Sequence, residues 1–354
     1  MPRRRSRRIS LGWRALPLSF PPRVGAPMSH EPLLKTEHLT KSFVARRDVL
    51  GRPKRYVHAV RDISIHVEEG ETLGLVGESG CGKSTLGRAI LRLHEPSSGR
   101  VFFRGKEITT LSKRELRPLR REMQIIFQDP HGSLNPRMTI RSILEEPLKV
   151  HGIAESKSEL DDRVEALMKR VGLRPDQLDR YPHEFSGGQK QRIGIARAIA
   201  LSPSFIVADE PISALDVSIQ AQIVNLLRDL QDDLGLTYLF IAHDLSIVEY
   251  LSHRVAVMYL GRVVEEGPAR ELYEAPLHPY TKALMSAAPS PDPRREKKRL
   301  ILHGDLPSPL DPPSGCAFHP RCPIARKGIC DRDEPPLRTV VPKRKAACHF
   351  AGEF

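Results

Sequence analysis

The sequence predicts an α/β fold with a parallel core sheet, an antiparallel β edge, a helical subdomain and a cysteine-rich C-terminal extension. Short apolar runs such as ETLGLV and SFIVAD read as buried strands, and they alternate with segments whose apolar residues recur at helical spacing. Four of the five cysteines lie in the Pro-rich stretch that closes the chain. At 354 residues, of which 40% are hydrophobic, the chain can bury a large core.

The basic residues are unevenly distributed along the chain. Seven arginines and no acidic residue precede Met28, so this segment carries more than half of the net charge of +13. We expect residues 1–27 to be a disordered basic extension, and the natural start to be Met28 rather than Met1. The charge therefore does not indicate a nucleic-acid partner. Because we find neither a run of eighteen apolar residues nor a secretory signal, we expect a reducing compartment.

A glycine-rich loop is predicted between the strand in ETLGLV and the helix that follows it. Its sequence, GESGCGKS, fits the pattern G-x-x-x-x-G-K-S/T in full. The glycines let backbone N–H groups face a phosphate at the positive end of the helix. We expect Lys83 to reach the β- and γ-phosphates and Ser84 to bind Mg²⁺. The predicted nucleotide-binding residues of this loop are Gly77, Glu78, Ser79, Gly80, Cys81, Gly82, Lys83, Ser84 and Thr85.

Two acids end the apolar run SFIVADEP. A buried parallel strand delivers such carboxylates to the C-terminal edge of a sheet. We expect Asp209 to hold Mg²⁺ through water and Glu210 to polarise the attacking water in phosphoryl transfer. The strand and the loop together predict hydrolysis of a nucleoside triphosphate.

A second predicted helix begins at an anion-binding sequence, SGGQ, which spans residues 186–189. One nucleotide does not need two such helix ends from the same chain. The arrangement is explained if Ser186 and Gly188 cover the γ-phosphate bound to another subunit, with Gly187 and Gln189 beside them. This predicts a head-to-tail dimer with ATP at its interface, and SGGQ resembles the signature motif of the ABC ATPases.

Further residues resemble family elements in the expected order. Gln128, at the end of MQIIFQ, resembles the Q-loop glutamine that senses Mg²⁺ and the attacking water. Asp216 in SALD resembles the D-loop residue that crosses the dimer interface, and His243 in LFIAHD resembles the switch histidine that contacts the γ-phosphate. Phe43 in LTKSF resembles the aromatic residue that stacks on adenine, with Tyr56 as the alternative.

The resemblance covers roughly residues 32–350 and implies a P-loop ABC ATPase fold. Residues 28–280 would form the ATPase domain, with a helical insert at about 128–190 that docks on a permease in this family. Residues 281–354 would be a Pro- and Cys-rich extension. The segment RVAVMYLGRVVEEG reads as a β-hairpin that turns at Gly261.

Three stretches resemble the ATPases of bacterial dipeptide and oligopeptide importers: DPHGSLNPRMTI, DEPISALDVSIQAQIVNLLRDLQ and HPYTKALMSAAPSP. The first, with SALDVSIQAQIV, is similar to the second ATPase of a heterodimeric pair. The implied partners are a second ABC ATPase subunit, two membrane permeases and, indirectly, a periplasmic substrate-binding protein, at the cytoplasmic face of the bacterial inner membrane. Importers of nickel or another small solute use similar subunits. Soluble, non-transport ABC ATPases are a further alternative, which the single phosphate loop and the short insert disfavour.

The extension contains four cysteines: Cys316, Cys322, Cys330 and Cys348. Successive cysteines are separated by five, seven and seventeen residues. A reducing compartment disfavours disulfides, and structural zinc usually takes close C-x₂₋₄-C pairs. Spacing alone leaves zinc, an iron–sulfur cluster and unligated thiols open. The resemblance implies a 4Fe-4S cluster, with Zn²⁺ as the alternative. We expect the bound cluster or metal to clamp the extension to the ATPase core, far from ATP.

Overall fold

The computed structural model describes residues 31–48, 52–287, 300, 302 and 304–354. The predicted basic extension over residues 1–27 and the alternative start at Met28 lie outside the described residues. From Glu31 to Phe354 the chain forms one unit. None of the helices in the described part is long and apolar enough to cross a membrane.

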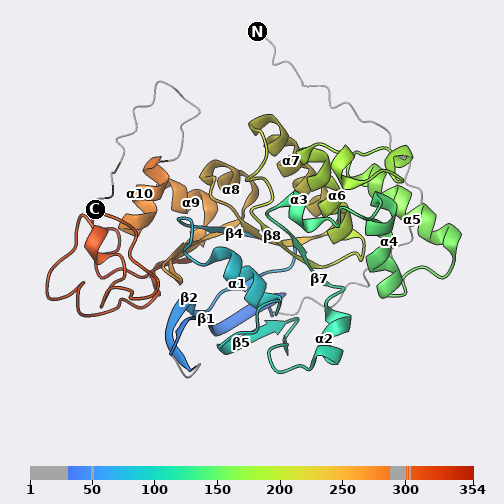
Figure 1. The fold of residues 1–354 in the computed structure, drawn as a ribbon. Helices are drawn as coiled ribbons and strands as arrows, with labels where there is room; N and C mark the ends of the chain where they lie inside the picture. The colour runs from blue at the N-terminus through green and yellow to red at the C-terminus, as the bar shows by residue number, and fades with distance from the viewer. Residues whose placement is uncertain (1–30, 49–51, 288–299, 301, 303) are drawn as a thin grey trace, which may run out of the picture. The chain divides into compact units, whose positions relative to one another are not determined.

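The core sheet contains eight strands within the described residues, in the order β12-β13-β11-β10-β4-β9-β8-β7, where β12 is Arg338–Val341 and β13 is Arg344–Ala346. Its strands β4, β8 and β7 are labelled in Figure 1. The neighbours from β10 to β7 pair in parallel. By contrast, β10 and β11 form the antiparallel hairpin predicted around Gly261. The bounds of the main strands are β4 (Thr72–Val76), β7 (Met123–Ile126), β8 (Phe205–Asp209), β9 (Thr237–Ile241), β10 (Arg254–Tyr259) and β11 (Arg262–Pro268).

Helices cover both faces of this sheet, in agreement with the complete burial of its central strands. Every residue of β4, β8 and β9 is buried, as expected for parallel strands that are covered on both sides. Val207 packs in the same cluster as α1, whereas Ile206 packs in the cluster of α6 and α7. The bounds of the covering helices are α1 (Lys83–Ile90), α6 (Gly187–Ile199), α7 (Val217–Leu234) and α8 (Leu245–Leu251).

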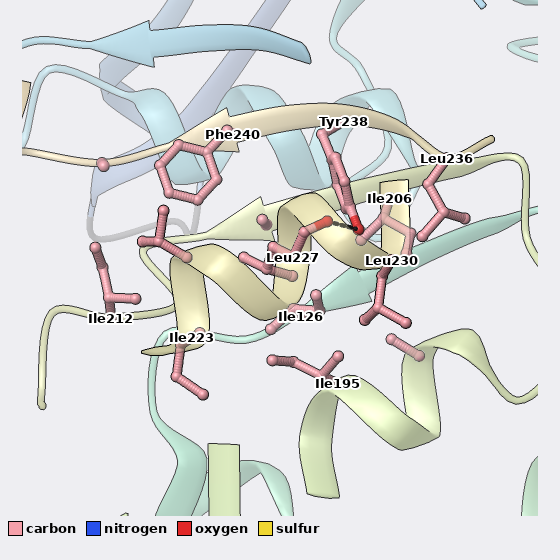
Figure 2. Packing of buried hydrophobic residues seen from close by; sticks show 14 of the residues in the cluster. Ile126, Ile195, Ile206, Ile212, Ile223, Leu227, Leu230, Leu236, Tyr238 and Phe240 are labelled. Carbon is pink, nitrogen blue, oxygen red and sulfur yellow. Dashed lines mark hydrogen bonds between the residues drawn. The ribbon is translucent and has the colours of Figure 1, made fainter. Parts of the chain in front are cut away.

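Figure 2 shows the α7 side of the sheet from close by. Leu227 and Leu230 of α7 belong to one buried cluster with Ile206 of β8 and Tyr238 of β9, and all four are labelled there. The buried Tyr238 hydroxyl donates a hydrogen bond to the Leu227 carbonyl at 3.2 Å, so its polar atom is paired inside the apolar core. This packing holds the first halves of β8 and β9 against α7.

The predicted antiparallel edge is a separate sheet with the order β2-β1-β5-β6, to which β3 adds beside β1. Helix α1 contacts β1 and β2 of this sheet as well as β8 and β9 of the core sheet. The phosphate loop before α1 therefore lies where the two sheets meet. The strand bounds are β1 (Leu34–Arg47), β2 (Pro53–Ile63), β3 (His66–Val67), β5 (Ser98–Phe103) and β6 (Lys106–Glu107), and α2 (Lys113–Leu119) follows.

The predicted helical insert lies between β7 and β8. Helix α6 contacts α3, α4 and α5 of the insert and also β7 of the core sheet. It begins at Gly187 and continues to Ile199, so the expected boundary near residue 190 falls inside it. The other helices of the insert are α3 (Pro130–Ser133), α4 (Ile140–Val150) and α5 (Lys157–Arg170).

The C-terminal extension joins the core sheet. Its β13 pairs with β11, and β12 pairs with β13. The expected boundary between residues 280 and 281 falls inside α10, because α10 packs on the core through buried side chains such as Tyr280. The elements are α9 (Ala269–Glu274), α10 (Pro279–Ala287), the short 3-10 helix η3 (His319–Arg321), β12 (Arg338–Val341) and β13 (Arg344–Ala346).

Candidate active site

The phosphate loop is enclosed by backbone from two other strands. A Cβ atom at Gly77 would lie 2.2 Å from the Met258 carbonyl oxygen, and one at Gly82 would lie 1.9 Å from the Ala59 carbonyl oxygen. Both glycines also have positive φ angles, of 153° and 105°. Only glycine fits at either position, so the shape of the loop depends on these two residues.

Lys83 opens α1 and turns its side chain back onto the loop. Its Nζ donates to the carbonyl oxygens of Gly77 at 2.8 Å and Glu78 at 3.1 Å. The side chain of Cys81 is buried beneath the loop, and burial raises the pKa of its thiol. Ser84 and Thr85 are half-buried in the first turn of α1. The loop therefore presents backbone and Lys83 rather than the Cys81 thiol.

Three predicted side chains converge at the ends of β7, β8 and β9. Gln128 Nε2 donates to Glu210 Oε2 at 2.8 Å, and His243 Nδ1 lies 3.6 Å from the same oxygen. Glu210 has a left-handed φ of 45°, and its N–H donates to the Ile241 carbonyl at 3.0 Å. Such strained backbone clusters at functional sites. An open hollow of about 500 Å³ is lined by Ser79, Lys83, Gln128, Asp129, Glu210, Ser213, Ala214 and His243.

Asp209 ends β8 with a side chain that is only 1% exposed. Its Oδ2 accepts a hydrogen bond from Arg88 Nη2 at 3.3 Å, whereas Oδ1 is buried without a hydrogen-bond partner. A buried carboxylate oxygen left unpaired needs an explanation, and a hydrated cation supplies one. Sequence reasoning missed Arg88, although a basic residue one turn after Ser84 on the same helix was a signal for it.

The residues predicted to act across a dimer do not line this hollow. Ser186 caps α6: its Oγ accepts from the Gln189 N–H at 3.3 Å, and Gln189 Oε1 accepts from the Ser186 N–H at 3.0 Å. Asp216 precedes α7 without a side-chain capping bond, and it is exposed. A Cβ at Gly188 would lie 2.6 Å from Ile219 Cγ2, a packing role that the sequence pattern did not reveal.

The two candidates for adenine stacking lie on paired strands. Phe43 pairs with Val57, and Val44 pairs with Tyr56. Because successive side chains alternate between faces, Phe43 and Tyr56 point to opposite sides of this ribbon. Their exposed fractions are similar, 37% and 43%. Only one of them can therefore stack on a nucleotide held by the loop.

The four cysteines of the extension line one small cavity, together with His278, Phe318 and other residues. All four are free thiols. In the described part of the chain, no group of three or more potential ligands is arranged to hold a metal ion. Burial raises the pKa of Cys316 to about 12 and that of Cys322 to about 11. The four thiols thus lie around one cavity, and the described residues show no metal site there.

The extension does not lie far from the phosphate loop, contrary to the expectation from sequence. Arg321, in η3, donates to both carboxylate oxygens of Glu78, at 2.8 Å and 3.1 Å. The N–H of Glu78 donates to the Tyr280 hydroxyl at 2.9 Å. The strand pairing of β13 and the buried aromatic ring of Phe318 bring this segment back over the core.

Comparisons with known proteins agree with this geometry. Residues 60–213 match the family described as ABC transporter, and residues 264–330 match the oligopeptide/dipeptide transporter C-terminal region. The oligopeptide transport ATP-binding protein AppF of Bacillus subtilis (strain 168) is 50% identical over 325 residues, which are 91% of this chain and 98% of that protein.

Solved structures of ATP-binding cassettes share the fold. The dimeric post-hydrolysis state of the cassette MJ0796 bound to ADP and Pi aligns with a TM-score of 0.60 and 30% identity, over 67% of this chain and 99% of that one. The cbiO1 subunit from Clostridium perfringens aligns with a TM-score of 0.58 and 30% identity, over 69% and 91% of the two chains.

Proposed function

The chain belongs to the ATP-binding subunits of peptide and oligopeptide ABC transporters, and on that basis we propose that it is the ATP-hydrolysing motor of a peptide importer. The observation that carries this proposal is the convergence of Gln128, Glu210 and His243 beside Lys83 at one edge of the parallel sheet. Ligand sites of open α/β sheets lie at such an edge. The matching C-terminal region supports peptide transport over import of nickel or another small solute.

Each side chain at the edge has a distinct task in the proposed hydrolysis. Lys83 binds the phosphates, and Phe43 stacks on adenine. Glu210 accepts a hydrogen bond from the attacking water, whose oxygen bonds to the γ-phosphorus while the bond to the β–γ bridging oxygen breaks. His243 contacts the γ-phosphate, and Gln128 holds the Glu210 carboxylate at 2.8 Å. ADP and inorganic phosphate are the products.

The residues of the site fit a magnesium ion. Asp209 offers a buried carboxylate oxygen without a partner, and Ser84 and Gln128 supply further oxygen ligands. Oxygen ligands with retained water are what Mg²⁺ prefers. The ion would neutralise charge on the phosphate groups.

The second half of each ATP site comes, in this proposal, from a partner ATPase. Ser186 is exposed at the N-terminus of α6, and Asp216 is exposed at the N-terminus of α7. No side chain in the first turn of α6 is acidic, so this helix end stays positive. Ser186, Gly187, Gly188, Gln189 and Asp216 then act on ATP bound to the partner.

The stretches DPHGSLNPRMTI and SALDVSIQAQIV favour the second ATPase of a heterodimeric pair. The pair would drive two permeases, fed by a periplasmic substrate-binding protein, and would sit peripherally at the cytoplasmic face of the inner membrane. Closure on ATP and opening after hydrolysis would alternate the access of the permeases.

We further propose that the cavity of the extension holds a 4Fe-4S cluster, with Zn²⁺ as the alternative. Four thiols, the donors that such a cluster takes, line one cavity. Each sulfur also has a backbone N–H nearby: Arg326 and Phe350 donate to Cys330 and Cys348 at 3.4 Å. Phe318 and Ile324 provide the corresponding N–H groups for Cys316 and Cys322. Backbone hydrogen bonds to sulfur are a property of iron–sulfur sites.

Reconstitution tests the transport function. The tagged chain is co-purified with its membrane partners, placed in vesicles, and supplied with the binding protein and a mixture of di- and oligopeptides. We expect peptide-stimulated ATP hydrolysis and peptide uptake. Uptake of nickel instead of peptide would overturn the substrate class, and ATP hydrolysis by a chain that recovers no permease would overturn the transport function.

A further inference from the structure

The C-terminal extension makes a bidentate ion pair with the phosphate loop. Arg321 Nη1 and Nη2 lie 2.8 Å and 3.1 Å from the two carboxylate oxygens of Glu78. The Arg321 side chain is 9% exposed and that of Glu78 is 26% exposed. Planar, two-point contacts of this kind are among the strongest polar interactions in proteins.

A carboxylate is an unexpected group in a loop that receives phosphates. Glu78 directly follows Gly77, and an unpaired negative charge there would repel a polyanion. Because the pair is largely shielded from water, the repulsion would be screened only weakly. Arg321 cancels this charge from a position that is 243 residues away in the sequence.

Glu78 is also held at its backbone, and this connects it to Lys83. Lys83 Nζ donates to the Glu78 carbonyl at 3.1 Å, and the Glu78 N–H donates to the Tyr280 hydroxyl at 2.9 Å. The ring of Tyr280 packs on Phe318, with centroids 5.4 Å apart, and Phe318 lies immediately before η3. A displacement of Arg321 would therefore also shift Glu78 and, through it, Lys83.

We propose that Arg321 is a positioning residue for nucleotide binding, which sets the ATP affinity of the phosphate loop by neutralising and orienting Glu78. The extension then contributes to nucleotide binding by the ATPase core on which it packs. This inference rests on ATP binding at the phosphate loop, as proposed above. It does not depend on the transported solute or on a metal at the cysteines.

A charge cycle on the purified full-length chain, titrated with ATP by calorimetry, tests the inference. Arg321→Gln leaves the carboxylate unpaired, so ATP affinity should fall roughly tenfold. Glu78→Gln removes the repelling charge, so its ATP affinity should lie well above that of Arg321→Gln. The double variant should recover to within about threefold of Glu78→Gln, because the charge that Arg321 neutralises is gone. A purely structural role for Arg321 predicts no such recovery, and a double variant as weak as Arg321→Gln would overturn the inference.

Two controls separate this inference from the assignment of the loop itself. Arg270→Gln alters an exposed arginine whose partner is Glu274, and it should leave ATP affinity unchanged. Lys83→Ala should abolish tight binding. If Lys83→Ala loses ATP and Arg321→Gln does not, only this inference is wrong; if both keep ATP, the phosphate-loop function is wrong as well. Should Arg321→Gln fail to fold, Arg321→Lys replaces it in the cycle, with a smaller expected loss since lysine keeps the charge.

Discussion

At the scale of single residues, the Glu210 carboxylate lies between two other predicted side chains of the site. Gln128 donates to it at 2.8 Å, and His243 lies 3.6 Å away. Neither contact belongs to the phosphate loop, so the carboxylate can be neutralised while the loop stays intact. A substitution of Glu210 should therefore lower ATP hydrolysis without lowering ATP affinity.

Glu210→Gln should lower ATP hydrolysis by at least about 100-fold while ATP affinity stays near that of the wild type, because only the positioning of water is lost. Single-turnover hydrolysis and equilibrium titration measure the two quantities. Glu274→Gln, on the exposed side chain that pairs with Arg270, is the matched control. Normal turnover by Glu210→Gln in the assembled transporter would contradict the assignment.

Phe43 and Tyr56 should respond differently to truncation, because their side chains lie on opposite faces of the β1–β2 ribbon. Loss of a stacking ring costs about 1–3 kcal/mol, so Phe43→Ala should weaken ATP binding about tenfold. Tyr56→Ala should leave it unchanged. Titration with ATP and with inorganic triphosphate, which lacks adenine, isolates the contribution of stacking. The opposite ranking would make Tyr56 the stacking residue.

At the scale of elements, the N-terminus of α6 has one glycine that can be substituted and one that cannot. A side chain at Gly188 would collide with Ile219 of α7 at 2.6 Å, whereas a Cβ at Gly187 would meet only Leu215 at 3.5 Å, an ordinary contact. A loss of function at Gly188 would thus mix a packing defect with a charge effect. Gly187 is the cleaner position for a test of the partner's ATP site.

Gly187→Asp should keep the ATP affinity of the isolated chain and lower hydrolysis by the assembled pair more than about tenfold, because a carboxylate would repel the partner's γ-phosphate. Gly187→Ala is the control for size. ATP-dependent dimer formation, measured by light scattering, reports closure directly. A drop in the affinity of the isolated chain would show that these residues act within one subunit.

At the scale of the whole molecule, the extension is tied to the ATPase core at several places. The pairing of β13 with β11 adds it to the sheet, and the buried pair of Arg344 with Glu265 joins the same strands at 3.0 Å. Arg321 joins it to the phosphate loop. Loss of order around the cysteines should therefore be felt at the nucleotide site.

Anaerobic purification should yield a chain that contains iron and sulfide in cluster stoichiometry, and replacement of all four cysteines by serine should remove both. Because burial raises the thiol pKa values to about 12 and 11 at Cys316 and Cys322, ligation must release protons. Metal uptake should accordingly strengthen as pH rises. Zinc without iron would point to the alternative metal, and metal retained by the serine variant would place it elsewhere.

The α/β fold class and the membership of the family were predictable from sequence and are confirmed. Local patterns sufficed because contiguous residues dictate the elements involved: GESGCGKS fits only a glycine turn before a helix, and SFIVADE fits only a buried strand that ends in acids. His243 was identified from the family resemblance, and it lies close to Glu210 because the ends of neighbouring parallel strands meet at one edge of the sheet. Their roles remain predictions.

Tertiary structure alone decided the contacts between segments that no local pattern relates. The pair of Arg321 with Glu78 and the collision that Gly188 avoids both depend on how helices and loops pack, which is set by side-chain volume and burial over the whole core. The placement of the extension beside the phosphate loop, rather than far from it, has the same origin. Sequence periodicity describes each element separately, and only the packed molecule determines which of them touch.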